Sequence, residues 1–440
     1  MKTDILIVGA GCAGLYAALN LPSQKKITII TKSDVESSDS FLAQGGICML
    51  KDEEDFPGYY EDTLKAGHYE NDTKSVEIMI WSSQDVIADL MSYGTNFHRH
   101  ADGSLDFTRE GGHGTHRILF HRDQTGKEIT SHLLEEVRHR ENITLLEHTT
   151  LLDIVEKDNV CYGAVIAHPD ETIETVEADY VFLATGGVGG LYRHSTNFRH
   201  LTADGLAIAL KHGIACKDTN YIQIHPTTFY TDSPKERSFL ISESVRGEGA
   251  KLYDKHMKRF TDELQPRDLL TKEILKQMEK DGTDFVWEDL RCIPHDELHK
   301  HFPNIVEYCK KMGYDPDKEC IPVVPAQHYY MGGIKVNHQS GTSMERLYAL
   351  GETACNGVHG KNRLASNSLL ESLVFAKRAA AEVKLQQVPL KKAPELFENF
   401  DPTPYEDRDA LAKEYANLVQ AEITRLNQIT KDPVIAEYRR

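Results

Sequence analysis

Residues 4–21 read DILIVGAGCAGLYAALNL, and this stretch decides the fold class. Its opening run DILIV predicts a short buried strand, and LYAALNL predicts a helix beside that strand. The glycines between them, Gly9, Gly11 and Gly14, allow a tight turn, close approach of the backbone to a pyrophosphate and close helix–strand contact. The N–H groups at the helix start stabilise such a phosphate. With a second strand expected at residues 27–31 (ITIIT), the sequence predicts a βαβ dinucleotide-binding unit.

Two later segments are expected to join the same sheet. Residues 180–184 (YVFLA) form an apolar run that ends in Thr-Gly-Gly, and residues 347–350 are followed by Gly-Glu. The carboxylate of that glutamate, Glu352, would lie at a strand end, where such folds hold a ribose hydroxyl. Simple NAD-binding enzymes do not need three separated segments on one dinucleotide. We therefore predict FAD as the cofactor.

Length and composition indicate a globular protein of at least two domains. The chain has 440 residues, of which 40% are hydrophobic and 27% charged, a profile unlike that of a disordered protein. Its formal net charge of −18 argues against nucleic acid and anionic membranes as partners, because both require a basic surface. No apolar run is long enough to span a bilayer and no signal peptide is recognisable, so we expect a cytoplasmic protein.

The cysteines and histidines suggest no metal site and no disulfide framework. No two cysteines have the C-x-x-C spacing, so we interpret all of them as small buried hydrophobic residues. We recognise no metal-ligand spacing among the 21 histidines, and we predict no bound metal. The cysteines are Cys12, Cys48, Cys161, Cys216, Cys292, Cys309, Cys320 and Cys355.

Changes in composition divide the chain into three parts. Residues 219–330 are richer in charge and in helical periodicity than their surroundings, which predicts a domain inserted into the cofactor-binding fold. We expect the FAD-binding domain to comprise residues 1–218 and 331–388, and residues 389–440 to form a helical tail. The tail begins with a proline-containing linker that includes Pro389 and continues as a long amphipathic helix at 405–429.

The predicted fold class is therefore α/β. It comprises an FAD-binding, Rossmann-like domain of the two-dinucleotide-binding type, an inserted α+β capping domain and a short helical C-terminal tail.

Five blocks carry an unusual density of His, Arg and Gly. Each alone has an ordinary explanation: a histidine in a loop, an Arg–Asp pair on the surface, or a helix N-cap at Asn-Ser-Leu. Together, two arginines and two histidines beside a flavin would supply the positive field that a dicarboxylate requires. The blocks are TREGGH (108–113), QIHPT (223–227), PRD (266–268), HYYMGG (328–333) and GKNRLASNSLLE (360–371).

On these motifs the chain resembles the L-aspartate oxidase family, within the succinate dehydrogenase and fumarate reductase flavoproteins. The resemblance extends from Ile5 to about Phe375 and is most specific in SFLAQGGI, TREGGH, QIHPT, RGEGA, HYYMGG and NRLASNSLLES. Together with the glycine motif, it implies a set of FAD contacts. These are Gly9, Ala10, Gly11, Cys12, Ala13, Gly14, Lys32, Asp39, Ser40, Phe41, Leu42, Ala43, Gln44, Gly45, Gly46, Asp204, Glu352, Ser368 and Leu369.

The same resemblance implies the catalytic and substrate-binding residues. It identifies Arg267 as the residue that shuttles a proton. It implies that His225, His328 and Arg363 hold the substrate carboxylates. Three further residues are expected at the substrate pocket: Gln223, Ser242 and Glu243.

Two positions separate the branches of the family. Flavoproteins that attach FAD covalently use a histidine where this chain has Asp39, so FAD should be bound non-covalently. Glu110 matches the aspartate oxidase branch, and a carboxylate there would be the counter-charge of the substrate α-ammonium, which succinate lacks. The alternative is that Glu110 is a solvated acid in a loop.

The implied reaction is oxidation of L-aspartate to iminoaspartate, with O₂ or fumarate as acceptor. In the family this is the first step of de novo NAD biosynthesis and supplies quinolinate synthase, a possible partner. The alternatives are a soluble fumarate reductase or succinate dehydrogenase-like flavoprotein, and a non-catalytic FAD-binding protein. The last is disfavoured because a binding module has no need of the Arg and His set just described.

Overall fold

A five-stranded parallel sheet forms the centre of the protein, in a computed structural model that describes residues 1–232, 236–386, 392–398 and 400–430. The strand order is β16-β9-β1-β2-β5, and every neighbouring pair is parallel. The strands predicted near residues 4–8, 27–31, 180–184 and 347–350 all belong to it, which confirms the Rossmann-like fold class. Their bounds are β1 (Ile5–Val8), β2 (Ile27–Ile30), β5 (Ile143–Leu146), β9 (Tyr180–Leu183) and β16 (Leu347–Ala349).

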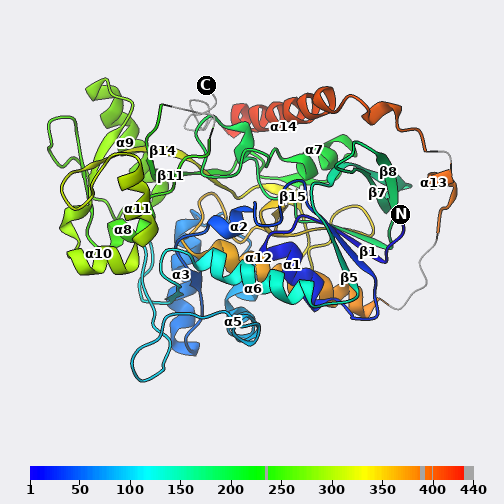
Figure 1. The fold of residues 1–440 in the computed structure, drawn as a ribbon, viewed down its shortest axis with the longest axis horizontal. Coiled ribbons are helices and arrows are strands. Elements are labelled where there is room, and N and C mark those ends of the chain that lie inside the picture. The colour runs from blue at the N-terminus through cyan, green and yellow to red at the C-terminus, as the bar shows by residue number, and fades with distance from the viewer. Residues whose placement is uncertain (233–235, 387–391, 399, 431–440) are drawn as a thin grey trace.

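Helices cover one face of this sheet, and a second, antiparallel sheet lies against the other (Figure 1). Alternate residues of β1 explain the two layers, because successive side chains point to opposite faces. Ile5 and Ile7 belong to the hydrophobic cluster with the helices, and Leu6 and Val8 to the other cluster. The helices are α1 (Cys12–Asn20), α6 (Thr125–Arg138) and α12 (Asn367–Leu385); the opposite layer contains β6 (Thr150–Lys157), β7 (Val160–Ala167), β8 (Ile173–Glu177) and α7 (Asp204–Lys211).

Two glycines of the first turn allow β1 and α1 to pack closely. The helix begins at Cys12, earlier than the apolar run alone predicts. Gly9 has φ +114°, in the region that favours glycine, and a Cβ there would lie 2.0 Å from the Ala184 carbonyl oxygen. A Cβ on Gly14 would lie 2.0 Å from the Gly9 carbonyl oxygen. Both glycines are therefore required for the strand, the turn and the helix to pack together.

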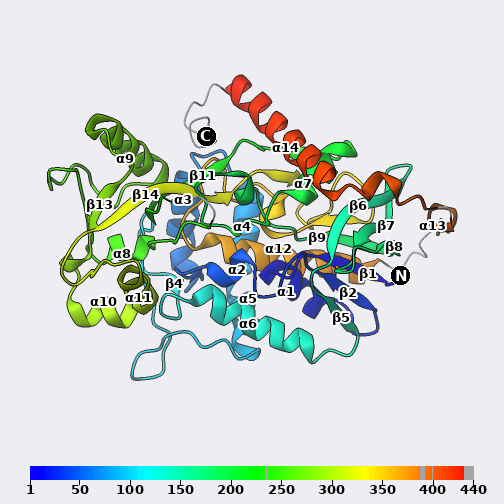
Figure 2. The same cartoon turned by 45° about the horizontal axis from the view of Figure 1, so that its top comes forward.

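Residues between β11 and β14 build a separate part of the structure, at the left of Figures 1 and 2. A four-stranded antiparallel sheet, β11-β14-β13-β12, packs on helices around its own hydrophobic cluster. This separate core supports our proposal of a capping domain at 219–330. The strands are β11 (Ile222–Phe229), β12 (Lys251–Tyr253), β13 (Val286–Asp289) and β14 (Ile321–Tyr330); the helices are α8 (Glu243–Gly247), α9 (Arg267–Asp281), α10 (His295–His301) and α11 (Pro303–Lys311).

The amphipathic helix predicted at 405–429 is present as α14 (Arg408–Thr430). It lies along α7 in both ribbon views and buries Leu411, Tyr415, Val419 and Ile423 in the same cluster as the second sheet. Pro389, in the predicted linker, lies outside the described residues. Among those residues no helix combines the length and the apolar character needed to cross a membrane.

Shorter elements connect these layers. They are α2 (Asp39–Leu42), β3 (Ile47–Cys48), α3 (Phe56–Ala66), α4 (Thr73–Trp81), α5 (Ser83–Ser92), β4 (Ile118–Leu119), β10 (Cys216–Lys217), β15 (Gly333–Lys335), β17 (Ala354–Cys355) and α13 (Glu395–Glu398).

Two of the sequence interpretations need correction. Six of the eight cysteines are buried, but Cys216 is only half-buried and Cys292 is exposed. The interpretation of all eight as small buried hydrophobic residues is therefore wrong for Cys292. The histidines do contain a pair at a ligand spacing: His295 and His299 are four residues apart on α10, with Asp317 beside them. Apolar periodicity gave no reason to single out either position, because both lie on the polar side of a short surface helix.

Candidate active site

One large cavity is lined both by the glycine turn and by the candidate catalytic residues. It encloses about 1650 Å³ of empty space, including its opening to solvent. Seventeen of the nineteen predicted FAD contacts lie on its wall; Gly14 and Phe41 lie behind it. Of the substrate set, Gln223 instead lines a neighbouring cavity. The others on the wall are Glu110, His225, Ser242, Glu243, Arg267, His328 and Arg363.

The half of the cavity beside the glycine turn has the properties of a dinucleotide site. The Cys12 backbone N–H donates to Ser40 Oγ over 3.0 Å, which holds the loop after the second strand against the turn. Ser38 Oγ, Asp39 Oδ2 and Gln44 Oε1 are buried and have no hydrogen-bond partner among the described residues. Buried polar atoms normally find partners, so these three fit a polar ligand along this wall.

Four predicted cofactor contacts have acidic or basic side chains, and three of them are Lys32, Asp204 and Glu352. The Lys32 ammonium donates to Asp204 Oδ2 over 2.7 Å. Glu352 Oε1 accepts the Tyr330 backbone N–H at 2.9 Å, and burial holds the pKa of Glu352 well above its usual range. Lys32 and Asp204 thus pair with each other, while Glu352 stays on the wall of the cavity at the end of β16.

Asp39 lies at the position where the resemblance places the histidine of flavoproteins that bind FAD covalently. Its Oδ1 accepts the Phe198 backbone N–H at 3.0 Å, and burial raises its pKa to about 7. A carboxyl group lacks the imidazole nitrogen that the covalent branch uses, so this residue offers no route to that bond.

Arg267 is the most firmly held cation of the site. It lies at the start of α9 and is buried, which rules out the surface Arg–Asp pair considered from the sequence. Its Nε donates to Glu243 Oε2 over 2.5 Å, and its Nη1 donates to Gln223 Oε1 over 2.9 Å. Gln223 in turn donates to the Arg363 carbonyl oxygen over 2.9 Å. Gln223 therefore positions both arginines without reaching the cavity wall.

Glu243 carries the charge that balances this cation. Burial acts to raise the pKa of Glu243, but the nearby guanidinium groups of Arg267 and Arg246 outweigh burial and lower it. The carboxylate therefore stays ionised beside Arg267 at neutral pH.

His225 and His328 lie together because their strands β11 and β14 pair in antiparallel fashion. Their ring centroids are 5.0 Å apart, nearly edge to face. His225 Nδ1 lies 2.9 Å from the Thr227 carbonyl oxygen, and its buried Nε2 has no partner in the part of the chain that the structure describes. His328 Nδ1 lies 2.8 Å from Thr196 Oγ1.

The histidines do not supply the positive field expected from the sequence. Burial, and then the charge of Arg267, hold the pKa of both His225 and His328 well below the usual range. Both imidazoles are therefore neutral at pH 7, and each carries a single N–H. His225 offers Nε2–H to a ligand in the tautomer whose Nδ1 accepts the Thr227 backbone N–H at 3.2 Å, and His328 offers Nε2–H when its Nδ1 accepts the Thr196 hydroxyl. The positive charge of the site comes from its arginines.

Arg363 is held by stacking, and part of its donor capacity remains open. Its Cζ lies 4.4 Å from the centroid of the Tyr329 ring, and its Nη1 donates to Ser368 Oγ over 3.3 Å. Its buried Nε has no partner within the described ranges. Burial and the charge of Arg267 lower its pKa to about 10, so it stays charged at neutral pH. Its guanidinium is suited to a bidentate contact with a carboxylate.

Glu110 is 5% exposed, which excludes the solvated loop acid considered above. Its Oε1 accepts the Ser244 hydroxyl at 2.7 Å, and its Oε2 accepts the Ser366 hydroxyl at 2.6 Å. Ser366 is the N-cap residue of α12, but its side chain makes no capping bond; its hydroxyl donates to Glu110 and accepts the Gly46 backbone N–H at 3.2 Å. The carboxylate is thus clamped between the capping region and the start of α12.

Sequence reasoning missed several residues of this site. Ser244 and Ser366 have no charge or spacing that marks them as partners of Glu110. Arg246 is 2% exposed and donates to the hydroxyl of Thr227 and, over 3.2 Å, to the Glu263 carbonyl oxygen. Arg246 belongs to the motif RGEGA, and an arginine in a glycine-rich block was the only sequence signal that could have identified it.

Comparison with known proteins identifies the family. The FAD binding domain family matches residues 4–369. The L-aspartate oxidase of Clostridium acetobutylicum is 48% identical over 383 residues, covering 87% of this chain and 88% of that protein. That of Clostridium perfringens is 49% identical over 380 residues and covers 86% of each chain.

Solved structures agree with this result. A variant of E. coli quinol fumarate reductase superposes with a TM-score of 0.82 at 30% identity, over 94% of this chain and 74% of that one. The sequence resemblance and the FAD prediction are confirmed. The chain belongs to the L-aspartate oxidase family of FAD-binding flavoproteins.

Proposed function

We propose that this protein is an FAD-dependent oxidase of L-aspartate that forms iminoaspartate, with O₂ or fumarate as the final electron acceptor. One observation carries the proposal: a single cavity joins the dinucleotide turn to a buried set of arginines, neutral histidines and one clamped carboxylate. When bound, FAD accepts the hydride that leaves the substrate α-carbon. In the family, this oxidation is the first step of de novo NAD biosynthesis, and its product is the substrate of quinolinate synthase.

The side chains of the cavity match the charges of aspartate. The substrate has two carboxylates and one ammonium. Arg363, with open donor capacity, and the N–H groups of His225 and His328 bind the carboxylates. Glu110 faces the same cavity and binds the ammonium. The protein thus selects its substrate by placing donors and one acceptor at fixed positions on the wall of one cavity.

Arg267 is the proposed proton shuttle. It lines the same cavity, and two hydrogen bonds from its guanidinium fix its orientation. In the fumarate-reducing direction it donates the proton that completes succinate, while Glu243 holds the guanidinium in place. A group positioned in this way contributes by orientation as well as by proton transfer.

A peroxide assay tests the function. The purified protein, supplied with FAD in air, should form hydrogen peroxide with L-aspartate and not with succinate or D-aspartate. Oxidation of succinate in place of L-aspartate would identify a succinate dehydrogenase or fumarate reductase-like flavoprotein. Binding of FAD without turnover of any of the three would identify a non-catalytic flavin-binding protein.

Non-covalent binding of FAD is a separate prediction, which follows from Asp39. Precipitating the holoprotein with acid should release all of its flavin into the supernatant, because no covalent bond retains it. Absorbance of supernatant and pellet near the flavin maximum measures the partition, with a covalent succinate dehydrogenase as the control that retains flavin. Flavin left in the pellet would contradict the assignment of Asp39.

A further inference from the structure

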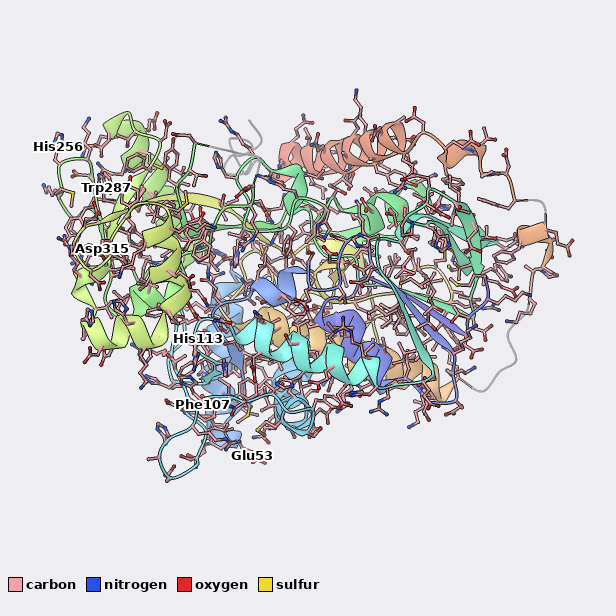
Figure 3. The ribbon with its side chains drawn as sticks, in the orientation of Figure 1. Glu53, Phe107, His113, His256, Trp287 and Asp315 are labelled. Carbon is pink, nitrogen blue, oxygen red and sulfur yellow. The ribbon has the colours of Figure 1, made fainter. Side chains whose placement is uncertain are left out.

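Three potential metal ligands meet on the outer face of the capping region. His295 and His299 are one helical turn apart on α10, and Asp317 belongs to the segment between α11 and β14. One ligand atom from each residue lies within 4.8 Å of the others. Figure 3 shows this part of the molecule, with Asp315 labelled, at the opposite side of the capping region from His113. None of the three residues lines the active-site cavity.

The distances are close to those of a coordination sphere. His299 Nε2 lies 2.9 Å from Asp317 Oδ1, and His295 Nε2 lies 4.0 Å from the same oxygen. The imidazole centroids are 4.4 Å apart with an angle of 32° between the rings. Zinc binds such atoms at about 2.0–2.2 Å, which separates the ligands of a tetrahedron by roughly 3.3–3.6 Å. The two imidazole–carboxylate separations lie on either side of that value, and all three ligand atoms lie within 4.8 Å of one another, so binding an ion requires rotation of these side chains.

We propose that His295, His299 and Asp317 form a binding site for a divalent transition metal, Zn²⁺ in particular. Two imidazoles and one carboxylate suit Zn²⁺ and not Mg²⁺, which requires octahedral oxygen ligands. Three protein ligands leave a fourth position for water. His295 is 70% exposed, so an ion can reach the site directly from solvent.

Lys310 is the nearest competitor for the carboxylate. Its ammonium lies 3.1 Å from Asp317 Oδ2, which is also 3.0 Å from His299 Nε2, whereas Asp317 Oδ1 faces only the two histidines in this cluster. Lys310 also lies 3.7 Å from Asp315 Oδ1, so it keeps an anionic partner when Asp317 binds an ion. Metal binding therefore need not leave the lysine unpaired.

The ion would connect two segments of the capping region. The opposite face of α10 is anchored by Leu298, and Phe302 and Ile305 follow in the same buried cluster. Binding across α10 and the segment before β14 stabilises the folded state, because the unfolded chain does not hold these ligands together. The role is structural and does not depend on the proposed catalytic function.

Zinc titration of the FAD-loaded protein tests the site. Competition with a chromophoric zinc chelator should reveal one ion whose affinity falls about tenfold or more in His295→Ala and in His299→Ala. Asp317→Asn should lower the affinity for the same zinc ion, and MgCl₂ should not displace that ion from the wild-type protein. ZnCl₂ should also raise the thermal midpoint of the wild-type protein more than that of the variants.

The matched control is His100→Ala, because the chain contains many other histidines. His100 is an exposed histidine beside a single carboxylate, with its Nε2 3.5 Å from Asp106 Oδ1. This variant should bind zinc as the wild type does. Equal zinc affinity in wild type, His295→Ala and His299→Ala, or no saturable binding in the wild type, would overturn the proposal. His295→Ala keeps the test decisive should His299→Ala fold poorly, because the exposed His295 side chain contributes little to packing.

Discussion

Arg267→Leu should lower kcat for fumarate reduction by about 10²–10⁴-fold, the usual contribution of positioned acid–base catalysis. The substitution removes the guanidinium that donates to Glu243 and Gln223, so both side chains lose this hydrogen bond. FAD should still bind, because the dinucleotide turn and the loop around Ser40 are built from other segments. Steady-state fumarate reduction and flavin content per chain measure the two effects.

Two comparisons make this prediction decisive. Arg140→Leu is the matched control, since Arg140 is 43% exposed and only loosely paired with Glu136 at 3.8 Å. A loss of rate no greater than that of Arg140→Leu would remove Arg267 from the mechanism. Because Glu243 loses its partner in Arg267→Leu, the thermal midpoint must be measured as well. Loss of flavin together with activity would indicate a folding defect.

Glu110→Gln should cut kcat/KM for L-aspartate by about 10²–10³-fold. Removing one partner of a charge pair in a dry pocket costs about 3–5 kcal/mol, and each tenfold corresponds to about 1.4 kcal/mol. Glutamine has the same shape and accepts one serine hydroxyl, so the clamp between Ser244 and Ser366 is largely preserved. Fumarate reduction should be nearly unchanged or faster, because fumarate has no ammonium.

Parallel assays of L-aspartate oxidation and fumarate reduction separate specificity from support of the loop. Glu135→Gln provides the control for a loss of one negative charge, because Glu135 is 66% exposed on α6. Equal losses of both activities in Glu110→Gln would mean that Glu110 stabilises its own loop, residues 108–113, and does not bind the substrate ammonium. The specific assignment of aspartate would then fail, although membership of the family would remain.

Short sequence patterns predicted the strands and the turn whose formation depends on residues close in the chain. The run DILIV, the glycine turn and ITIIT are close in the chain, and each has a steric reason that is visible in the letters alone. The strand at Leu347–Ala349 was also predictable, because an apolar run before Gly-Glu is a local signal. Its position at the edge of the sheet beside β9 was not, because pairing of distant strands leaves no mark on either one.

The candidate site was predictable in its charged residues and not in their partners. Arg267 and Arg363 stand out as basic residues in unusual blocks, and the resemblance supplied their roles. That the histidines are neutral depends on burial and on the proximity of Arg267, both of which are products of tertiary structure. The hydroxyl groups on Glu110 come from residues more than 100 positions away in the chain.

The order of strands in the central sheet has a consequence for synthesis in the cell. β9 is complete at Leu183, but its outer neighbour β16 begins only at Leu347. At about 5–20 residues per second, translation of the intervening chain leaves that edge of β9 unpaired for roughly ten to thirty seconds. An open edge of this kind pairs readily with other chains. The outer edge of β9 is therefore an aggregation-prone site of the nascent chain until β16 is synthesised.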